Sequence, residues 1–179
     1  MDLASIRYGK ALFNLATEKN ELDKYKLAQE SISALLKENQ DLGNILSNPT
    51  ILRDDKITLI EKILKTNVPD DFIGLIILLI RRGREGILPE LLEHFNDLYL
   101  EYKKIAHAKV YSPRPLADEK IAEIRNIISK KIEKIIEIEN IINTDIIAGF
   151  IVEVEGFLFD ASVKTRLANV KKQLLTVNL

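Results

Sequence analysis

The residues that could carry out chemistry are few and widely spaced. The chain has no cysteine and two histidines, so we expect no thiolate nucleophile, no disulfide and no metal site built on cysteine or on several histidines. His94 follows Glu90 by four residues in an expected helix, where the two side chains can pair on one face. His107 stands alone in an expected strand. Because no nucleophile or metal ligand accompanies them, both histidines are interpreted as surface or hydrogen-bonded side chains.

The glycines and carboxylates also lack a catalytic pattern. A phosphate-binding loop needs glycines whose backbone N–H groups wrap the phosphates, usually followed by Lys and then Ser or Thr. Gly9 and Lys10 are followed by Ala11, and the segment from Gly83 to Gly86 lacks dinucleotide-loop spacing. Four acids alternate with apolar residues, as on the outward face of a half-buried sheet: Glu137, Glu139, Glu153 and Glu155. The sequence therefore predicts no catalytic residue, no cofactor, no metal ion and no small-molecule substrate.

The composition indicates a globular protein of one or two domains. The chain has 179 residues, of which 46% are hydrophobic and 30% charged. With 26 basic and 27 acidic residues the formal net charge is -1, which argues against nucleic acid as a partner. The longest apolar run, from Phe72 to Ile80, has about nine residues, whereas a membrane-spanning helix needs about 20. The N-terminus does not have the pattern of a secretory signal.

Helical periodicity dominates the chain as far as residue 105. Four residues fall on one helix face at spacings of three and four: Tyr8, Ala11, Leu12 and Leu15. The pattern recurs in four later stretches, which are Leu22 to Leu36, Ile57 to Leu64, Phe72 to Ile80 and Ile87 to Tyr102. Pro49 and Gly83 interrupt it between helices. Five or six helices with short connections predict a bundle.

The second part of the chain has a different pattern. Ala106 to Ser112 is typical of a strand, Asp118 to Ile132 of a helix, and Ile135 to Phe159 alternates as strands do around a turn at Gly156. Ser162 is a candidate N-cap for a last helix. Its apolar stripe is expected to contain Val163, Leu167, Val170 and Leu174. The chain is therefore predicted to be mostly α, with a helical bundle over 1–105 and a small α+β domain over 106–179.

Two of the expected helices carry more apolar surface than one neighbour can cover. The first helix is apolar over a wide arc, and the helix from Phe72 to Ile80 is apolar on every side. One interpretation is an uncovered groove that binds a partner helix. The other is that both helices are simply central in the bundle. The periodicity alone leaves both interpretations open.

Six segments, in order along nearly the whole chain, resemble those of one family, the delta subunit of bacterial F-type ATP synthase, the counterpart of the mitochondrial oligomycin-sensitivity-conferring protein. They are Arg7 to Phe13 (RYGKALF), Asn48-Pro49 with Lys56, Gly83-Arg84 with Leu88 to Glu90, Val110 to Ser112 with Pro115-Leu116, Ile147 to Phe150 (IAGF), and Asp160 to Leu167 (DASVKTRL). Each segment is weakly specific alone, and their order and spacing carry the resemblance.

The resemblance implies a non-enzymatic stator subunit that links the catalytic head to the peripheral stalk, so that proton-driven rotor rotation is coupled to ATP synthesis. It implies an N-terminal six-helix bundle that holds the N-terminal helix of one α subunit, and a C-terminal domain that contacts the C-terminus of the b subunit. It also implies a peripheral position at the cytoplasmic face of the bacterial membrane, one copy per complex and a monomer in isolation. The alternative is a helical adaptor or regulator that binds an amphipathic partner helix outside ATP synthase.

The resemblance also suggests which residues meet each partner. For the α subunit these are Tyr8, Ala11, Leu12, Leu15, Leu75, Leu78 and Leu79, between the first and fifth helices. For the b subunit they are Phe150, Phe157 and Arg166. The chain departs from the family pattern at four positions, which are Gly9, Pro113, Asn143 and Ala148. Ala148 stands where the family has the first of two glycines, which puts the turn geometry there in question because alanine resists positive φ.

Overall fold

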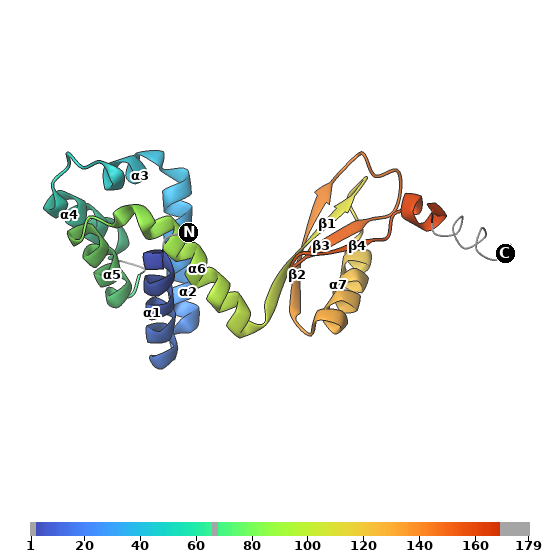
Figure 1. Ribbon diagram of the computed structural model, residues 1–179, viewed down its shortest axis with the longest axis horizontal. Coiled ribbons are helices and arrows are strands. Elements are labelled where there is room, and N and C mark those ends of the chain that lie inside the picture. Colours follow the sequence, from blue (N-terminus) through green and yellow to red (C-terminus); the bar gives the residue numbers. More distant parts are fainter. Residues whose placement is uncertain (1–2, 66–67, 169–179) are drawn as a thin grey trace. The chain divides into compact units, whose positions relative to one another are not determined.

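The computed structural model describes residues 3–65 and 68–168, and the chain divides into two compact units (Figure 1). Unit 1 is Met1–Leu100 and unit 2 is Glu101–Leu179. The sequence predicted the boundary after residue 105, which is five residues later in the chain than the observed boundary after Leu100. The predicted position lies just beyond the end of the helix that crosses from one unit into the other. Each unit is described separately.

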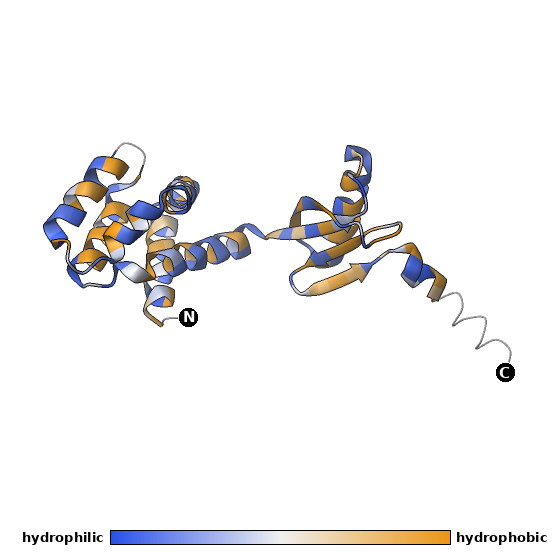
Figure 2. Cartoon of the chain, turned by 90° about the horizontal axis from the view of Figure 1, so that it is seen from above, coloured by the Kyte–Doolittle hydropathy of each residue, from blue (hydrophilic) through white to orange (hydrophobic). Residues whose placement is uncertain are grey.

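Unit 1 is helical. Its elements are α1 (Leu3–Glu18), α2 (Leu22–Glu38), α3 (Gln40–Ser47), α4 (Arg53–Leu64), α5 (Asp70–Arg81), the short 3-10 helix η1 (Glu85–Ile87) and α6 (Leu88–Lys103), which runs past the boundary. In Figure 2 these helices carry hydrophilic and hydrophobic residues on different sides, as amphipathic helices do. Within the described residues, no helix has both the length and the apolar character needed to cross a membrane.

Aromatic rings from four helices meet in the core of unit 1. Tyr25 of α2 stacks on Phe72 of α5 with ring centres 6.1 Å apart, and Phe72 lies 6.4 Å from Phe95 of α6. Phe13 of α1 meets Phe95 edge-on. Tyr25, Phe72 and Phe95 are fully buried. Such rings bury large apolar areas, so this cluster fixes how α1, α2, α5 and α6 pack together.

Gly9 determines how closely α1 and α6 approach. A Cβ atom at this position would lie 3.2 Å from the Leu91 carbonyl oxygen and 3.2 Å from the Cβ of His94. Both contacts are tighter than ordinary van der Waals packing. The glycine therefore lowers helix propensity, but it lets the backbone of α1 lie directly against α6.

Unit 2 is built on a four-stranded sheet in the order β2-β1-β3-β4. β1 (Ile105–Ser112) pairs in parallel with β2 (Ile135–Ile142) and antiparallel with β3 (Ile151–Val154), which pairs antiparallel with β4 (Phe157–Asp160). Parallel strands need a crossover connection, and α7 (Asp118–Ile132) supplies it between β1 and β2. The structure thus confirms a mostly helical chain with a small sheet.

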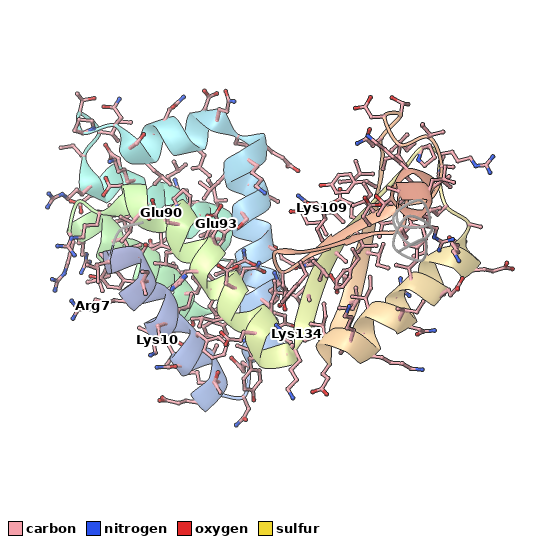
Figure 3. All side chains as sticks on the ribbon, turned by 45° about the vertical axis from the view of Figure 1, so that its right-hand side comes forward. Arg7, Lys10, Glu90, Glu93, Lys109 and Lys134 are labelled. Carbon is pink, nitrogen blue, oxygen red and sulfur yellow. The ribbon has the colours of Figure 1, made fainter. Side chains whose placement is uncertain are left out.

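The two faces of the sheet differ in character. Alternate β1 residues, including Ala108 and Val110, are buried in a core with Ile124 and Ile128 of α7. The intervening residues, such as Lys109 (labelled in Figure 3), are exposed. This period-two alternation is what the sequence predicted.

Two glycines make the turns of unit 2. Gly156 has φ +79 in the hairpin between β3 and β4, at the predicted turn. Gly149 has φ +94, whereas Ala148 does not have a positive φ. The question raised by Ala148 is therefore resolved, because the second position of the motif carries the left-handed backbone. Residues 163–168 are helical, and the predicted stripe residues Val170 and Leu174 lie outside the described residues.

Candidate functional site

Helix α1 presents one buried face and one accessible flank. Ser5, Gly9, Leu12 and Ala16 are the buried residues, which lie on one face at helical spacing. Three of the residues expected to bind the α subunit lie on the adjoining flank: Tyr8 and Leu15 are half-buried and Ala11 is exposed. Leu12, expected beside them, is only 2% exposed and belongs to the core. Its side chain therefore lies beneath this flank and does not form part of its surface.

Helix α5 has the same organisation. Its buried residues include Leu79, which is 0% exposed and also belongs to the core. Leu75 is half-buried and Leu78 is 39% exposed. Of the seven residues expected for the α-subunit site, five thus have accessible surface. We call these five the α1/α5 surface: Tyr8, Ala11, Leu15, Leu75 and Leu78.

A polar cluster links the end of α1 to the start of α5. Lys19, just after α1, pairs with Asp71 in the first turn of α5, and the Tyr25 hydroxyl donates to the same carboxylate at 3.0 Å. The hydrogen bonds from Lys19 and Tyr25 lower the pKa of Asp71, while the bond to Asp71 raises the pKa of Lys19. Burial, and then the hydrogen bond to Asp71, raise the pKa of Tyr25 to about 12. The cluster therefore links the end of α1, through Lys19, and α2, through Tyr25, to the first turn of α5.

Unit 2 contains an open pocket of about 620 Å³, a volume within the range of ligand-binding sites. We call it the loop pocket, and its lining comes from three separate segments, residues 113–120, 147–150 and 161–166, which include the start of α7 and the first helical residues after β4. Phe150 and Arg166, both expected to contact the b subunit, line it. The third expected residue, Phe157, does not. It lies on β4, is 60% exposed and stacks against Phe159 with ring centres 6.5 Å apart.

Backbone hydrogen bonds fix the segments that form the loop pocket. The N–H of Ala161 donates to the carbonyl of Phe150, and the N–H of Val163 donates to the carbonyl of Ala148. Asp160 accepts from the N–H of Ser162 and from the hydroxyl of Thr165. These hydrogen bonds lower the pKa of the Asp160 carboxyl group, and the bond from Thr165 has the largest effect. The loop pocket is therefore a preformed feature of unit 2.

The histidines lie in ordinary surroundings. The Nδ1 atom of His107 is 3.2 Å from the Glu137 carboxylate on the exposed face of the sheet. His94 is half-buried where α6 meets Gly9, and Glu90 accepts a hydrogen bond from Ser5 of α1 at 3.1 Å. Figure 3 labels Glu90 and Glu93 on α6 and Arg7 and Lys10 on α1. Across residues 3–65 and 68–168, no three His, Cys, Asp or Glu residues are grouped so as to hold a metal ion.

A family model described as "ATP synthase delta (OSCP) subunit" matches residues 4–174. The chain belongs to this family. The "ATP synthase subunit delta" of Bacillus pumilus is 31% identical over 177 residues, with 98% of this chain and 97% of the relative covered. That of a Geobacillus species is 30% identical over 175 residues, covering 97% and 98%. In fold, the chain is similar to a chain of the Toxoplasma gondii mitochondrial ATP synthase hexamer, with a TM-score of 0.70, 20% identity and 98% of each chain covered.

Sequence reasoning about this delta-family chain missed a buried ion pair in unit 1. Lys56 of α4 is 2% exposed, and its ammonium donates to Glu85 at 2.6 Å and to the Leu46 carbonyl at 2.5 Å. It thereby ties α4 to α3 and η1. The sequence did contain a signal for this buried lysine, because Lys56 lies four residues before Ile60 and eight before Leu64, the other buried residues of α4. A lysine in register with an apolar stripe indicates a buried cation that needs a partner.

Proposed function

We propose that this chain is a non-catalytic stator subunit of an F-type ATP synthase. It links the catalytic head to the peripheral stalk, so that rotation of the rotor drives ATP synthesis and does not turn the head. The family match over residues 4–174 carries this proposal, because it covers both units of the chain. Association with other ATP synthase subunits also fits the relatives, which are named as subunits of that complex.

Unit 1, as a six-helix bundle, binds the N-terminal helix of the α subunit on the α1/α5 surface. Leu15, Leu75 and Leu78 supply apolar area, and the small side chain of Ala11 allows a partner helix to approach closely. Tyr8 adds a ring whose hydroxyl can remain in water. Leu12 and Leu79 contribute indirectly, because they pack in the core of unit 1 and so fix the positions of α1 and α5.

Unit 2 binds the C-terminus of the b subunit through Phe150, Phe157 and Arg166. Phe157 offers an exposed ring on β4, and Phe150 and Arg166 line the loop pocket. The subunit is a monomer in isolation, present once per complex at the cytoplasmic face of the membrane. It contributes no catalytic group, and its role is mechanical.

Calorimetric titration of the full chain with a peptide of the first ~20 residues of the α subunit from the same genome tests this function. We expect one-to-one binding with a negative heat-capacity change, because apolar surface is buried. Ala11→Asp places a carboxylate in the contact, and burying it unpaired costs several kcal/mol. The affinity should therefore fall by about a hundredfold or more.

The matched control is Ala122→Asp, which changes an exposed alanine of α7 in the other unit. It should leave the affinity for the α peptide unchanged. Wild-type affinity in a folded Ala11→Asp variant would remove the site assignment. Failure of the folded wild-type chain to bind the peptide would instead favour an adaptor for some other amphipathic helix.

A further inference from the structure

The loop pocket combines an apolar lining with positive charge. The larger apolar side chains of its lining come from all three segments: Pro113, Leu116, Ile147, Phe150 and Val163. Ile147 is 85% exposed and Val163 is 41% exposed. Leu167, four residues after Val163 on the same helix face, is 65% exposed and extends this apolar surface. Exposed apolar groups gathered at one place indicate a surface that a partner covers.

Three cations lie among these apolar groups, namely Arg114, Lys120 and Arg166. Lys120 pairs with Glu123 of α7 at 2.6 Å. Arg114 and Arg166 are exposed, and neither has an ion pair with a carboxylate in the part of the chain that the structure describes. The lining residues of the pocket, all of them described, include no Asp or Glu. The pocket is therefore complementary to a ligand that is both apolar and negatively charged.

We propose that the loop pocket recognises an acidic amphipathic segment of the b subunit, with apolar side chains entering the pocket and carboxylates pairing with Arg114 and Arg166. This inference rests on the proposed function, since it names the chemistry by which that partner is selected. Guanidinium groups suit this role because they bind carboxylates through two parallel hydrogen bonds. Phe157, on β4, contacts the partner only outside the pocket.

The exposed face of the sheet does not offer the same chemistry. Four glutamates lie on or beside it, and several of its charges are already paired: His107 with Glu137 at 3.2 Å, and Lys134 with Glu155. The Tyr111 hydroxyl donates to Glu153 at 3.0 Å. A segment rich in carboxylates would be repelled there. The acidic partner is thus directed to the loop pocket.

The test is binding of the full chain to a peptide of the last ~25 residues of the b subunit from the same genome, measured by fluorescence anisotropy. A second peptide has every Asp and Glu replaced by Asn and Gln. The variant Arg114→Gln/Arg166→Gln should bind the native peptide at least about tenfold more weakly than wild type does. The matched control Lys109→Gln removes an exposed cation from the other face of unit 2 and should change affinity less than about twofold.

The peptide pair identifies the interaction. Wild type should bind the amide peptide as weakly as the double arginine variant binds the native one, and the variant should not distinguish the two peptides. Ile147→Ser, at a side chain too exposed to support the fold, should also weaken binding. Circular dichroism verifies that each variant is folded.

Two results would overturn the pocket proposal, and only one of them would also contradict the b-subunit part of the proposed function. If the native peptide binds the wild type and the double arginine variant equally well, the pocket is not the site, while the b-subunit partnership stands. If the native peptide does not bind the folded wild-type chain although the α-subunit peptide does, the pocket proposal fails together with the b-subunit part of the proposed function.

Discussion

Replacing Lys56 by methionine is expected to destabilise unit 1 by about 3 kcal/mol. Methionine keeps most of the apolar stem of the side chain and removes the ammonium group. In the native protein Lys56 is 2% exposed, and its ammonium group donates to Glu85 at 2.6 Å and to the Leu46 carbonyl at 2.5 Å. The variant therefore removes one buried charge and leaves its partner behind.

The magnitude follows from what remains of Glu85. Its side chain is 13% exposed, and its Oε2 atom is buried with no hydrogen-bond partner among the described residues. Breaking a buried ion pair by deleting one member costs roughly 3–5 kcal/mol, because the other charge stays buried and unpaired. The residual exposure of Glu85 places the expected cost at the lower end of that range.

A double-mutant cycle makes the prediction specific. Lys56→Met/Glu85→Leu removes both charges, so its stability should return to within about 1 kcal/mol of wild type. Lys62→Met, at an exposed lysine of the same helix, should change stability by less than about 0.5 kcal/mol. Urea unfolding followed by circular dichroism measures the free energies, and amide hydrogen exchange of α4 assigns them to unit 1. A cost below about 1 kcal/mol for Lys56→Met, or simple additivity in the cycle, would refute this reasoning.

Two further predictions concern Gly149 and Tyr25. In Gly149→Ala, at φ +94, the new Cβ would lie 2.6 Å from the Ala161 carbonyl oxygen, so thermal unfolding should show that unit 2 loses about 3 kcal/mol or more of stability. The control Gly156→Ala, at φ +79 with open space around it, should cost only about 1–2 kcal/mol. Equal losses of stability would contradict the steric argument. The pKa of Tyr25 is raised from 10.0 to about 12, so its contribution is present below pH 10 and declines towards pH 12 by roughly 1.4 kcal/mol per pH unit. The stability advantage of wild type over Tyr25→Phe should therefore shrink across that range in denaturant titrations, and a constant difference would show that Tyr25 does not titrate as proposed.

Periodicity predicted the helices of unit 1 well, but it could not rank depth along one helix face. Ala11, Leu12 and Leu15 share the first apolar arc, yet Leu12 is core and Ala11 is exposed. In α5 the neighbours Leu78 and Leu79 differ from 39% to 0% exposure. Spacing locates a residue around its own helix, whereas burial depends on which neighbouring helices lie beside it. The same arc thus contributes to the core and to an accessible flank, and the binding of a partner helix on that flank stays a prediction.

The positions that depart from the family pattern show which sequence signals need three-dimensional context. Gly9 is unfavourable for an isolated helix, and its reason becomes apparent only when Leu91 of α6 lies 3.2 Å from the missing Cβ. Ala148 raised doubt about a turn whose left-handed residue is in fact Gly149. A propensity argument treats each residue alone, so it identifies the unusual position correctly but does not supply the packing that explains it.

The loop pocket was beyond sequence reasoning for a different reason. Phe150 and Arg166 were predicted individually, but their common site is lined by three stretches that lie far apart in the chain, residues 113–120, 147–150 and 161–166. The last two stretches are brought together by the antiparallel pairing of β3 and β4, which sets the Ala161 N–H against the Phe150 carbonyl. Long-range pairing of this kind leaves no local pattern in the chain. The apolar face of a helix can therefore be anticipated from spacing, whereas a pocket assembled by sheet topology has to be found from the structure and then tested by its charge.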